Sequence, residues 1–267
     1  LYTVTKQGGV YMEDVSTPST PVLVDSISLA SYLGTGEYLV DVQVHTTPGE
    51  LLVAVLSTKR LFTISPQGGV LTLKGQTEAI STTTAHATFS DVELVLWNRM
   101  VLGKNATGDV VAYVIAQCTG YESATPTRPF AQVLVACDLN KSGSYVSPTF
   151  LPATPRLYNP FPVAPSGWAA YLVSNPDAAK EDFSVWDCAL TSNGGTNYLY
   201  VCHGRMNQVK RLTVTDVLGA GFTVSSLIQC HPNYTADPAT NTAPRIQNIA
   251  VHPSNFEKFI IFEYETG

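Results

Sequence analysis

The chain of 267 residues has a formal net charge of -6 and a pI near 5.3; charged residues make up only 13% of it and hydrophobic residues 45%. This composition excludes a disordered acidic segment. No basic cluster is present to replace the counterions of a nucleic acid, and no apolar run approaches the ~18 residues of a membrane-spanning helix. We therefore expect one globular domain over residues 1–267, with no nucleic-acid partner and no transmembrane segment.

Short strands are predicted along nearly the whole chain, because segments rich in Val, Leu, Ile, Thr and Tyr alternate with Gly, Pro, Asn and Ser. No amphipathic helix of three turns is found, so the expected fold class is all-β. The proline-dense stretch 148–165 is predicted to be a long surface connection, since proline removes a backbone donor and cannot occupy a central strand. The clearest predicted strands are, in chain order, Tyr38–His45, Glu50–Leu56, Arg60–Ser65, Asp109–Gln117, Ala131–Leu139, Tyr198–His203, Gln208–Val214 and Lys258–Tyr264.

Two internal repeats bear on how these strands are arranged. Leu1–Val10 matches Leu61–Val70 at an offset of 60 without a gap, and nine of the ten positions are identical or similar. Ile249–His252 matches Val42–His45 at an offset of 207, and Glu257 falls on Glu50 in the same register. In this register the C-terminus stops where the N-terminal repeat begins. The two ends of the chain are therefore predicted to share one sheet.

Repeats of about 40–60 residues are typical of β-propellers. Blade starts are predicted near residues 38, 80, 184 and 246, and the long interval from 80 to 184 holds either one blade with insertions or two blades. We expect a propeller of four or five blades, with five favoured because the chain divides into about 53 residues per blade. The ring is predicted to close by pairing of N-terminal with C-terminal strands, which leaves no open sheet edge.

The cysteines and the glycosylation sequons bear on the compartment. Asn105, Asn140 and Asn233 begin N-x-S/T sequons, which together with few lysines favour a secreted or cell-surface glycoprotein. The chain begins at Leu1 with neither Met nor signal peptide, so a processed chain or an excised domain is expected. No C-x-x-C is present, and we predict disulfides across hairpins, with the fifth cysteine free or paired outside the chain: Cys118–Cys137, Cys188–Cys202, and Cys230 as the fifth.

Five polar residues are candidates for a binding site in a central channel. His45, His86 and His252 occupy corresponding repeat positions, and a ring of imidazoles could bind a metal. The alternative is that each histidine caps the turn after its strand through a backbone hydrogen bond. Asp41 and Asn248 align at the offset of 207 and are predicted to line the channel. For this pair the alternative is an ordinary polar residue at a strand end.

Calcium is the one cofactor for which the sequence offers part of a site. Asp138, Asn140 and Ser142, followed by Gly143, match the first half of a calcium loop, but the twelfth position is Thr149 in place of a bidentate Glu. Turn chemistry of a β-hairpin explains the same residues. A glycan on Asn140 would exclude ligation. No other cofactor is expected.

Residues 1–58 resemble the opening of a known propeller family. The matching pieces are Gln7-Gly8-Gly9, the strand Val22–Ser28, Gly36-Glu37-Tyr38-Leu39 and a strand that ends in His45, and Ile249–Phe256 resembles a second turn of the same family. The family is that of the soluble quinoprotein sugar dehydrogenases, which includes glucose/sorbosone-dehydrogenase-like and hedgehog-interacting-protein-like domains. The resemblance implies a β-propeller fold.

The chemistry of that family is not matched. Val40-Asp41-Val42 stands where the family has glycines, and no histidine precedes Asn193-Gly194-Gly195, where the family's catalytic histidine would lie. No nucleophile motif of the G-x-S-x-G type is found either. The resemblance therefore implies the scaffold without its catalytic residues.

Two functions follow from these patterns. The first is a secreted, glycosylated propeller that acts as a non-catalytic binding, adhesion or assembly module for an extracellular protein or glycan, within a larger extracellular structure. The second is a propeller enzyme, quinoprotein-dehydrogenase-like or lactonase-like, with its active site in the central channel. Convergent polar groups in a pocket would distinguish the enzyme from the scaffold.

Overall fold

The structure is a computed structural model that describes residues 1–47, 50–79, 93–104, 110–119, 132–141, 144–150, 185–193, 196–203, 207–214, 222–231, 245–252 and 255–264. These residues form an all-β protein with two three-residue 3-10 turns, Ala30–Tyr32 and Gln67–Gly69. The strands are β1 (Tyr2–Val4), β2 (Gly9–Asp14), β3 (Val22–Ser28), β4 (Leu39–Thr47), β5 (Glu50–Ser57), β6 (Leu61–Ser65), β7 (Thr72–Gln76), β8 (Glu93–Lys104), β9 (Val110–Thr119), β10 (Gln132–Lys141), β11 (Ser144–Phe150), β12 (Val185–Asn193), β13 (Thr196–His203), β14 (Gln208–Val214), β15 (Phe222–Gln229), β16 (Arg245–His252) and β17 (Asn255–Tyr264).

The strands form five small antiparallel sheets, each made of strands that are consecutive in the chain. Three sheets have four strands, in the orders β4-β5-β6-β7, β11-β10-β9-β8 and β12-β13-β14-β15. The other two are the three-stranded β1-β2-β3 sheet and the two-stranded β16-β17 sheet. Within the described residues no sheet closes on itself. All eight strands predicted above are confirmed to within three residues, and so is the all-β class.

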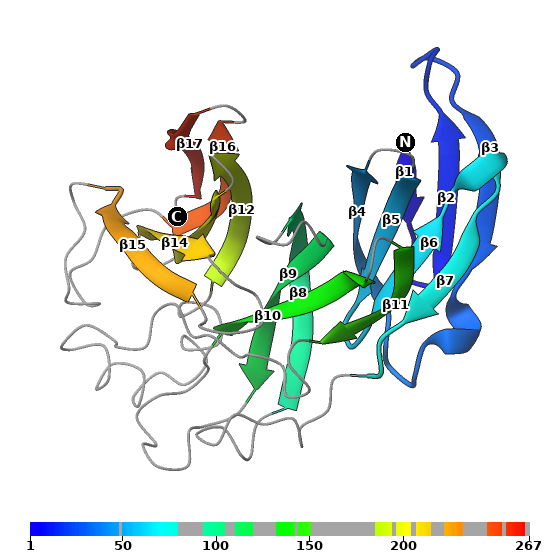
Figure 1. Cartoon of the computed structure of the whole chain (residues 1–267), viewed down its shortest axis with the longest axis horizontal. Helices are drawn as coiled ribbons and strands as arrows, with labels where there is room; N and C mark the ends of the chain where they lie inside the picture. Colours follow the sequence, from blue (N-terminus) through cyan, green and yellow to red (C-terminus); the bar gives the residue numbers. More distant parts are fainter. Residues whose placement is uncertain are drawn as a thin grey trace.

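The sheets follow one another in chain order. The first strand of each later sheet lies beside the first strand of the next, so that β4 contacts β8, β8 contacts β12 and β12 contacts β16. Figure 1 shows the resulting row, from the β1–β3 sheet on the right, through β8–β11, to β12–β17 on the left. The sheets after the first begin at Leu39, Glu93, Val185 and Arg245. Residues 80–92 and 151–184, which include the predicted blade start near 80 and most of the proline-rich connection, lie outside the described residues.

Pro148 corrects one detail of the proline-rich connection. It lies inside β11, not in a loop. Strand β11 is the outermost strand of its sheet, and an edge strand tolerates a missing backbone donor because only one of its sides is in the ladder. Its partner β10 shifts register between Asp138 and Asn140, opposite the proline. Residues 148–150 are therefore part of a strand and not of a loop.

The two ends of the chain do not pair in this structure. Strand β1 pairs with β2, and β17 pairs with β16. Figure 1 shows the N-terminus and the C-terminus at different ends of the row. The predicted pairing of Leu1–Lys6 with Lys258–Tyr264 is thus not made. The reason is packing, because two separate cores hold the terminal strands on different neighbours.

The first of these, core A, joins the β1–β3 sheet to the β4–β7 sheet. Phe62 of β6 is completely buried in it, and the ring of Tyr32 meets Phe62 edge-on at 6.5 Å between centroids. Tyr2 and Val4 of β1 pack against this core from its edge. Its buried members are Val10, Met12, Leu29, Leu39, Val53, Val55, Phe62, Ile64 and Leu71.

The second, core B, joins the β12–β15 sheet to β16 and β17. Tyr200 of β13 contacts Phe259 of β17, with ring centroids 5.6 Å apart. Ile261 of β17 packs on the same core. The buried members are Ala189, Tyr200, Cys202, Val209, Ile246 and Ile249. The C-terminal strands are therefore held on β12–β15, away from β1.

The cysteine register overturns both predicted disulfides. Cys188 is paired with Val201 and Cys202 with Asp187, so the two cysteines are diagonal neighbours whose side chains point to opposite faces of the sheet. Cys137 is paired with Ala112, six residues along β9 from Cys118, which at the rise of a strand is about 20 Å. A disulfide needs Cα atoms within about 7 Å. None of the four cysteines Cys137, Cys188, Cys202 and Cys230 forms a disulfide within the described part of the chain.

The repeated Gln-Gly-Gly turns show why glycine recurs there. Gly8 has φ +101° and Gly68 has φ +65°, so the first glycine of each turn takes a backbone conformation that L side chains rarely adopt. At Gly8 the turn also carries the chain against the next segment, because its carbonyl accepts the N–H of Leu29 at 2.7 Å. A Cβ on Gly8 would lie 2.7 Å from the backbone nitrogen of Ala30, whereas one on Gly68 would meet nothing within 4 Å.

We expect Gly8→Ala to destabilise the protein more than Gly68→Ala. Both variants bear the cost of a left-handed non-glycine residue, about 1–2 kcal/mol, and Gly8→Ala adds a clash with backbone that cannot move aside without disturbing core A. The two free energies of unfolding, measured in denaturant, test this. Equal losses in the two variants would contradict the close contact between the turn and Ala30.

Candidate functional site

The first strands of four successive sheets share one local irregularity. Each has a β-bulge, and the bulges fall at matching places: between Leu39 and Asp41, Leu96 and Met100, Val185 and Asp187, and Ile246 and Asn248. In β4, β12 and β16 the polar residue is the first one paired after the bulge, whereas the bulge of β8 spans residues 97–99 and ends with Arg99. With these residues aligned, the strands read LVDVQVH from Leu39, WNRMVLG from Trp97, VWDCALT from Val185 and IQNIAVH from Ile246. The third position of each segment is polar. These four residues, Asp41, Arg99, Asp187 and Asn248, are called the polar row below.

Asp41 joins β4 to β8. One carboxylate oxygen accepts the N–H of Val42 at 2.8 Å, within its own bulge. The other accepts the N–H of Met100, on β8, at 2.8 Å, and the side chain of Gln43 lies 3.5 Å from the same oxygen. The carboxylate thus satisfies backbone donors on both sides of the boundary between two sheets.

Asp187 does the same between β12 and β16 and is also ion-paired. Its Oδ1 accepts the N–H of Cys188 at 2.8 Å, and its Oδ2 accepts the N–H of Ile249, on β16, at 3.0 Å. The Nε of Arg99, on β8, lies 3.1 Å from Oδ1. The side-chain amide of Asn248 is 3.5 Å from Oδ2. Asp187 therefore connects three sheets through one carboxylate.

Burial dominates the electrostatics of both carboxylates. The side chain of Asp187 is fully buried, while that of Arg99 is 42% exposed. Loss of water raises the pKa of Asp187 above its ordinary value, and the hydrogen bond from Ile249 and the charge of Arg99 offset only part of the rise. Burial likewise raises the pKa of Asp41, against the hydrogen bonds from Met100 and Val42. Arg99 acts on both carboxylates, so it lies between two acids.

Two of the five predicted channel residues belong to the polar row. Asp41 and Asn248 occupy equivalent positions, and the row connects them through Arg99 and Asp187. His45 on β4 is half-buried and His252 on β16 is exposed, and Figure 1 shows these strands in different parts of the row. The structure therefore does not bring this pair of histidines together, and His86 lies outside the described residues.

The predicted half-site for calcium lies in a β-hairpin. Asp138 pairs with Thr149 and Asn140 with Tyr145, so both residues are in the ladder between β10 and β11. Ser142 lies outside the described residues. The backbone here is thus that of the hairpin alternative, and no group of three His, Cys, Asp or Glu in the described ranges is arranged to hold a metal ion. The sequons at Asn105 and Asn233 also fall outside these ranges.

Sequence reasoning had not singled out Arg99 and Asp187. A signal existed, since Val40-Asp41-Val42 and Trp186-Asp187-Cys188 both place an aspartate between apolar residues in a first strand. The signal is weak, because it rests on one residue type in otherwise different segments. Met100 donates its N–H to a residue 59 positions away and Ile249 to one 62 positions away. Such partners leave no local pattern.

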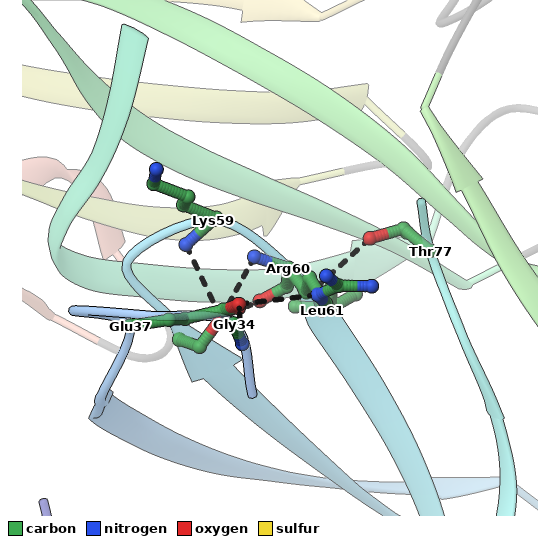
Figure 2. Close-up of polar contacts among 7 residues, drawn as sticks. Gly34, Glu37, Lys59, Arg60, Leu61 and Thr77 are labelled. Atoms are coloured by element: carbon green, nitrogen blue, oxygen red, sulfur yellow. Dashed lines mark hydrogen bonds and ion pairs between the residues drawn. The ribbon is translucent and has the colours of Figure 1, made fainter. Parts of the chain in front are cut away.

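A second polar cluster lies at the end of the β4–β7 sheet (Figure 2). Glu37 has a fully buried side chain that accepts the N–H of Gly34 at 2.8 Å, pairs with the Nε of Arg60 at 3.2 Å and accepts the hydroxyl of Ser57. Ser57 in turn accepts the N–H groups of Lys59 and Arg60. The cluster fixes the turn between β5 and β6 against the loop before β4.

Next to this turn, Leu61 donates its N–H to the hydroxyl of Thr77 at 3.1 Å, and Thr77 donates its own N–H back to the Leu61 carbonyl at 2.9 Å. Figure 2 shows both residues beside the Glu37 cluster. Every contact of Glu37 serves the backbone or the turn. Glu37, part of the Gly36-Glu37 segment on which the family resemblance rests, thus has a structural role here.

With this geometry the chain is an all-β protein of small antiparallel sheets joined by polar contacts between first strands. No protein-family model matches the chain, and no curated protein matches it. Among solved structures it is similar to a functionally unknown protein from Desulfotomaculum acetoxidans, with 10% identity and a TM-score of 0.38 over 93% of this chain and 68% of that one. The helices of the described part are too short to cross a membrane.

We expect Asp187→Asn to change how stability depends on pH. Because the folded-state pKa of Asp187 is raised above 3.8, the native state holds its proton more tightly, and this stabilisation is lost as pH rises from 3.8 through the folded-state pKa. The asparagine cannot ionise but still accepts the N–H of Ile249. The stability of the variant relative to wild type should therefore improve as pH rises through this window, as measured by denaturant unfolding at several pH values.

Asp14→Asn is the matched control. Asp14 is exposed, and a hydrogen bond from the N–H of Ser16 lowers its pKa. Its stabilisation is present above 3.8 and is lost as pH falls through the folded-state pKa, so the sign is opposite. If the stabilities of the two variants relative to wild type changed with pH in the same direction, burial would not be the main influence on the pKa of Asp187.

Proposed function

We propose that the chain is a secreted, glycosylated module of the β-propeller type that binds an extracellular protein or glycan without catalysing a reaction. Its blades are four or five in number: the three four-stranded sheets are complete blades, and β16 and β17 begin a last blade that N-terminal strands complete. The loops at one end of the blades then carry the binding surface, as in other rigid scaffolds. The module belongs to a larger extracellular assembly at or outside the cell surface.

The polar row is the observation that supports a scaffold. Its two carboxylates accept backbone N–H groups of the neighbouring first strands, from Met100 and Ile249, at 2.8 and 3.0 Å. A carboxylate committed in this way links sheets, whereas a general base must reach a substrate proton. The carboxylates of the polar row, which the blade model places near the axis, therefore have a structural role: they hold neighbouring sheets together.

The ion pairs of two arginines support the same proposal. A quinone cofactor carries carboxylates that are best held by Arg or Lys. Arg99 is paired with Asp187 and Arg60 with Glu37. His203, the nearest substitute for the histidine missing before Asn193, ends β13 opposite Val185 and Gln208. These pairings favour the module over the propeller enzyme.

The extracellular part of the proposal is tested by secretion from a eukaryotic host. We expect the secreted protein to carry N-linked glycans that a glycosidase removes, and the variants Asn105→Gln, Asn140→Gln and Asn233→Gln should each lose the mass of one glycan. A glycan array and a screen of extracellular proteins with the same material should then yield a ligand. A secreted protein with none of the three glycans would contradict the proposal.

The non-catalytic part is tested by reconstitution. After incubation with pyrroloquinoline quinone and calcium, we expect no reduction of a redox dye by glucose or other aldoses. Asp187→Asn serves as the control for stability, because it disturbs the polar row without touching His203. Robust activity that disappears in His203→Ala and persists in Asp187→Asn would overturn the proposal in favour of the enzyme.

A further inference from the structure

The β16–β17 sheet is half as wide as the three sheets that precede it in the row. It has two strands where each of those has four, and the outer edge of β17 has no partner strand among the described residues. Two large apolar side chains of β17 are open to solvent, Ile260 at 65% and Phe262 at 57%. An edge of this kind, apolar and unpaired, is a template for another strand.

The internal repeat indicates what covers such a strand. At the offset of 207, Ala250 and Asn248 of β16 correspond to Gln43 and Asp41 of β4, so their partners Ile260 and Phe262 take the places of Ala54 and Leu56 of β5, which are 0% exposed. Ala54 pairs with Thr63 and Leu56 with Leu61, so β6 is the strand that covers this edge of β5. Strand β17 has the sequence of a covered strand but lacks the third strand of its blade.

The same repeat assigns β1 to the missing position. At the offset of 60, β1 corresponds to β6. The Leu61 carbonyl accepts the N–H of Thr77 at 2.9 Å, and the Leu1 carbonyl accepts the N–H of Glu13 at the same distance. Strand β1 is thus hydrogen-bonded to β2 in the same way as β6 is to β7. Because bonding direction alternates along a strand, the N–H and C=O of Tyr2 and Val4 point to the other edge, where β6 bonds β5.

We propose that the open edge of β17 binds strand β1 of a second copy of this chain, head to tail. The register of β5 with β6, carried over by the repeat, places Thr3 opposite Ile260 and Leu1 opposite Phe262. Opposed residues of antiparallel strands point to the same face, so Ile260 and Phe262 join Leu1, which is itself 59% exposed. The contact completes a β16-β17-β1-β2-β3 sheet from two chains.

A second copy supplies the strand because the chain's own β1 lies in another part of the row. Core A holds β1 on the β4–β7 sheet and core B holds β17 on the β12–β15 sheet. For β1 and β17 of one chain to pair, the contacts among β4, β8, β12 and β16 would have to rearrange. These contacts include the hydrogen bonds of the polar row. Pairing between copies leaves all of them in place. Two copies joined at both ends have eight blades, within the range of about four to eight found in propellers.

This inference rests on the proposed blade architecture, and crosslinking separates the two. Copies that carry Leu1→Cys are mixed with differently tagged copies that carry Phe262→Cys and treated with a short thiol crosslinker. We expect a crosslinked heterodimer in the mixture, above the background of wild type treated alike. Crosslinking only within single chains of the double variant would overturn the second copy and leave the closing blade intact. If neither the mixture nor the double variant gives a crosslink, both the second copy and the blade completed by N-terminal strands are overturned.

Association in solution gives an independent measurement. Phe262→Lys places a charge in the proposed contact and should weaken self-association, measured by analytical ultracentrifugation, by about tenfold or more. Leu227→Lys is the matched control, because Leu227 is an apolar residue of β15 that is 54% exposed and outside the contact; its association should equal that of wild type. A monomeric wild type, or an equal effect of both substitutions, would overturn the proposal.

Discussion

The buried carboxylate of Asp187 is the contact on which the arrangement of the sheets most depends. A bulge frees backbone N–H groups from the ladder, and a buried N–H without a partner is costly. Asp187 satisfies the N–H of Cys188 in its own bulge and of Ile249 across the boundary, and it pairs with Arg99 of a third sheet. Asp41 repeats the arrangement with Val42 and Met100. Sheets built of consecutive strands are thereby joined edge by edge at their first strands.

Burial on both faces is the second constraint. In β5, residues 52–56 are all completely buried, so this strand reads as a continuous apolar run because sheets or strands cover it on each side. Strand β17 carries a similar run, from Phe259 to Phe262, but alternate residues are exposed. Ile261 packs on core B while Ile260 and Phe262 do not. The difference between the two strands lies in what surrounds them, not in their composition.

The buried carboxylates of this protein serve its architecture. A resemblance to a catalytic family drew attention to Gly36-Glu37, and the buried Glu37 fixes the turn before β6 through Gly34 and Arg60. The aspartates of the polar row link strands in the same way. A buried charge whose partners are backbone donors and an oppositely charged side chain is explained by the needs of the fold. A binding module of the kind proposed would then use loops or sheet edges, and β17 has the edge for which the internal repeat indicates a complementary strand.

The local pattern of residues was enough to predict the eight strands, the all-β class and the repeats, because strand formation and turns depend on neighbours within a few positions. The Gln-Gly-Gly turns are one example, because Gly8 and Gly68 both have a positive φ that favours glycine. Only the tertiary structure revealed Arg99 as the partner of Asp187, because bonds across the sheet boundaries join residues about 60 positions apart. It also decided that Cys188 and Cys202 face opposite sides, since one residue of register moves a side chain to the other face. Where β1 lies relative to β17 was likewise set by cores A and B, whose packing depends on the whole chain.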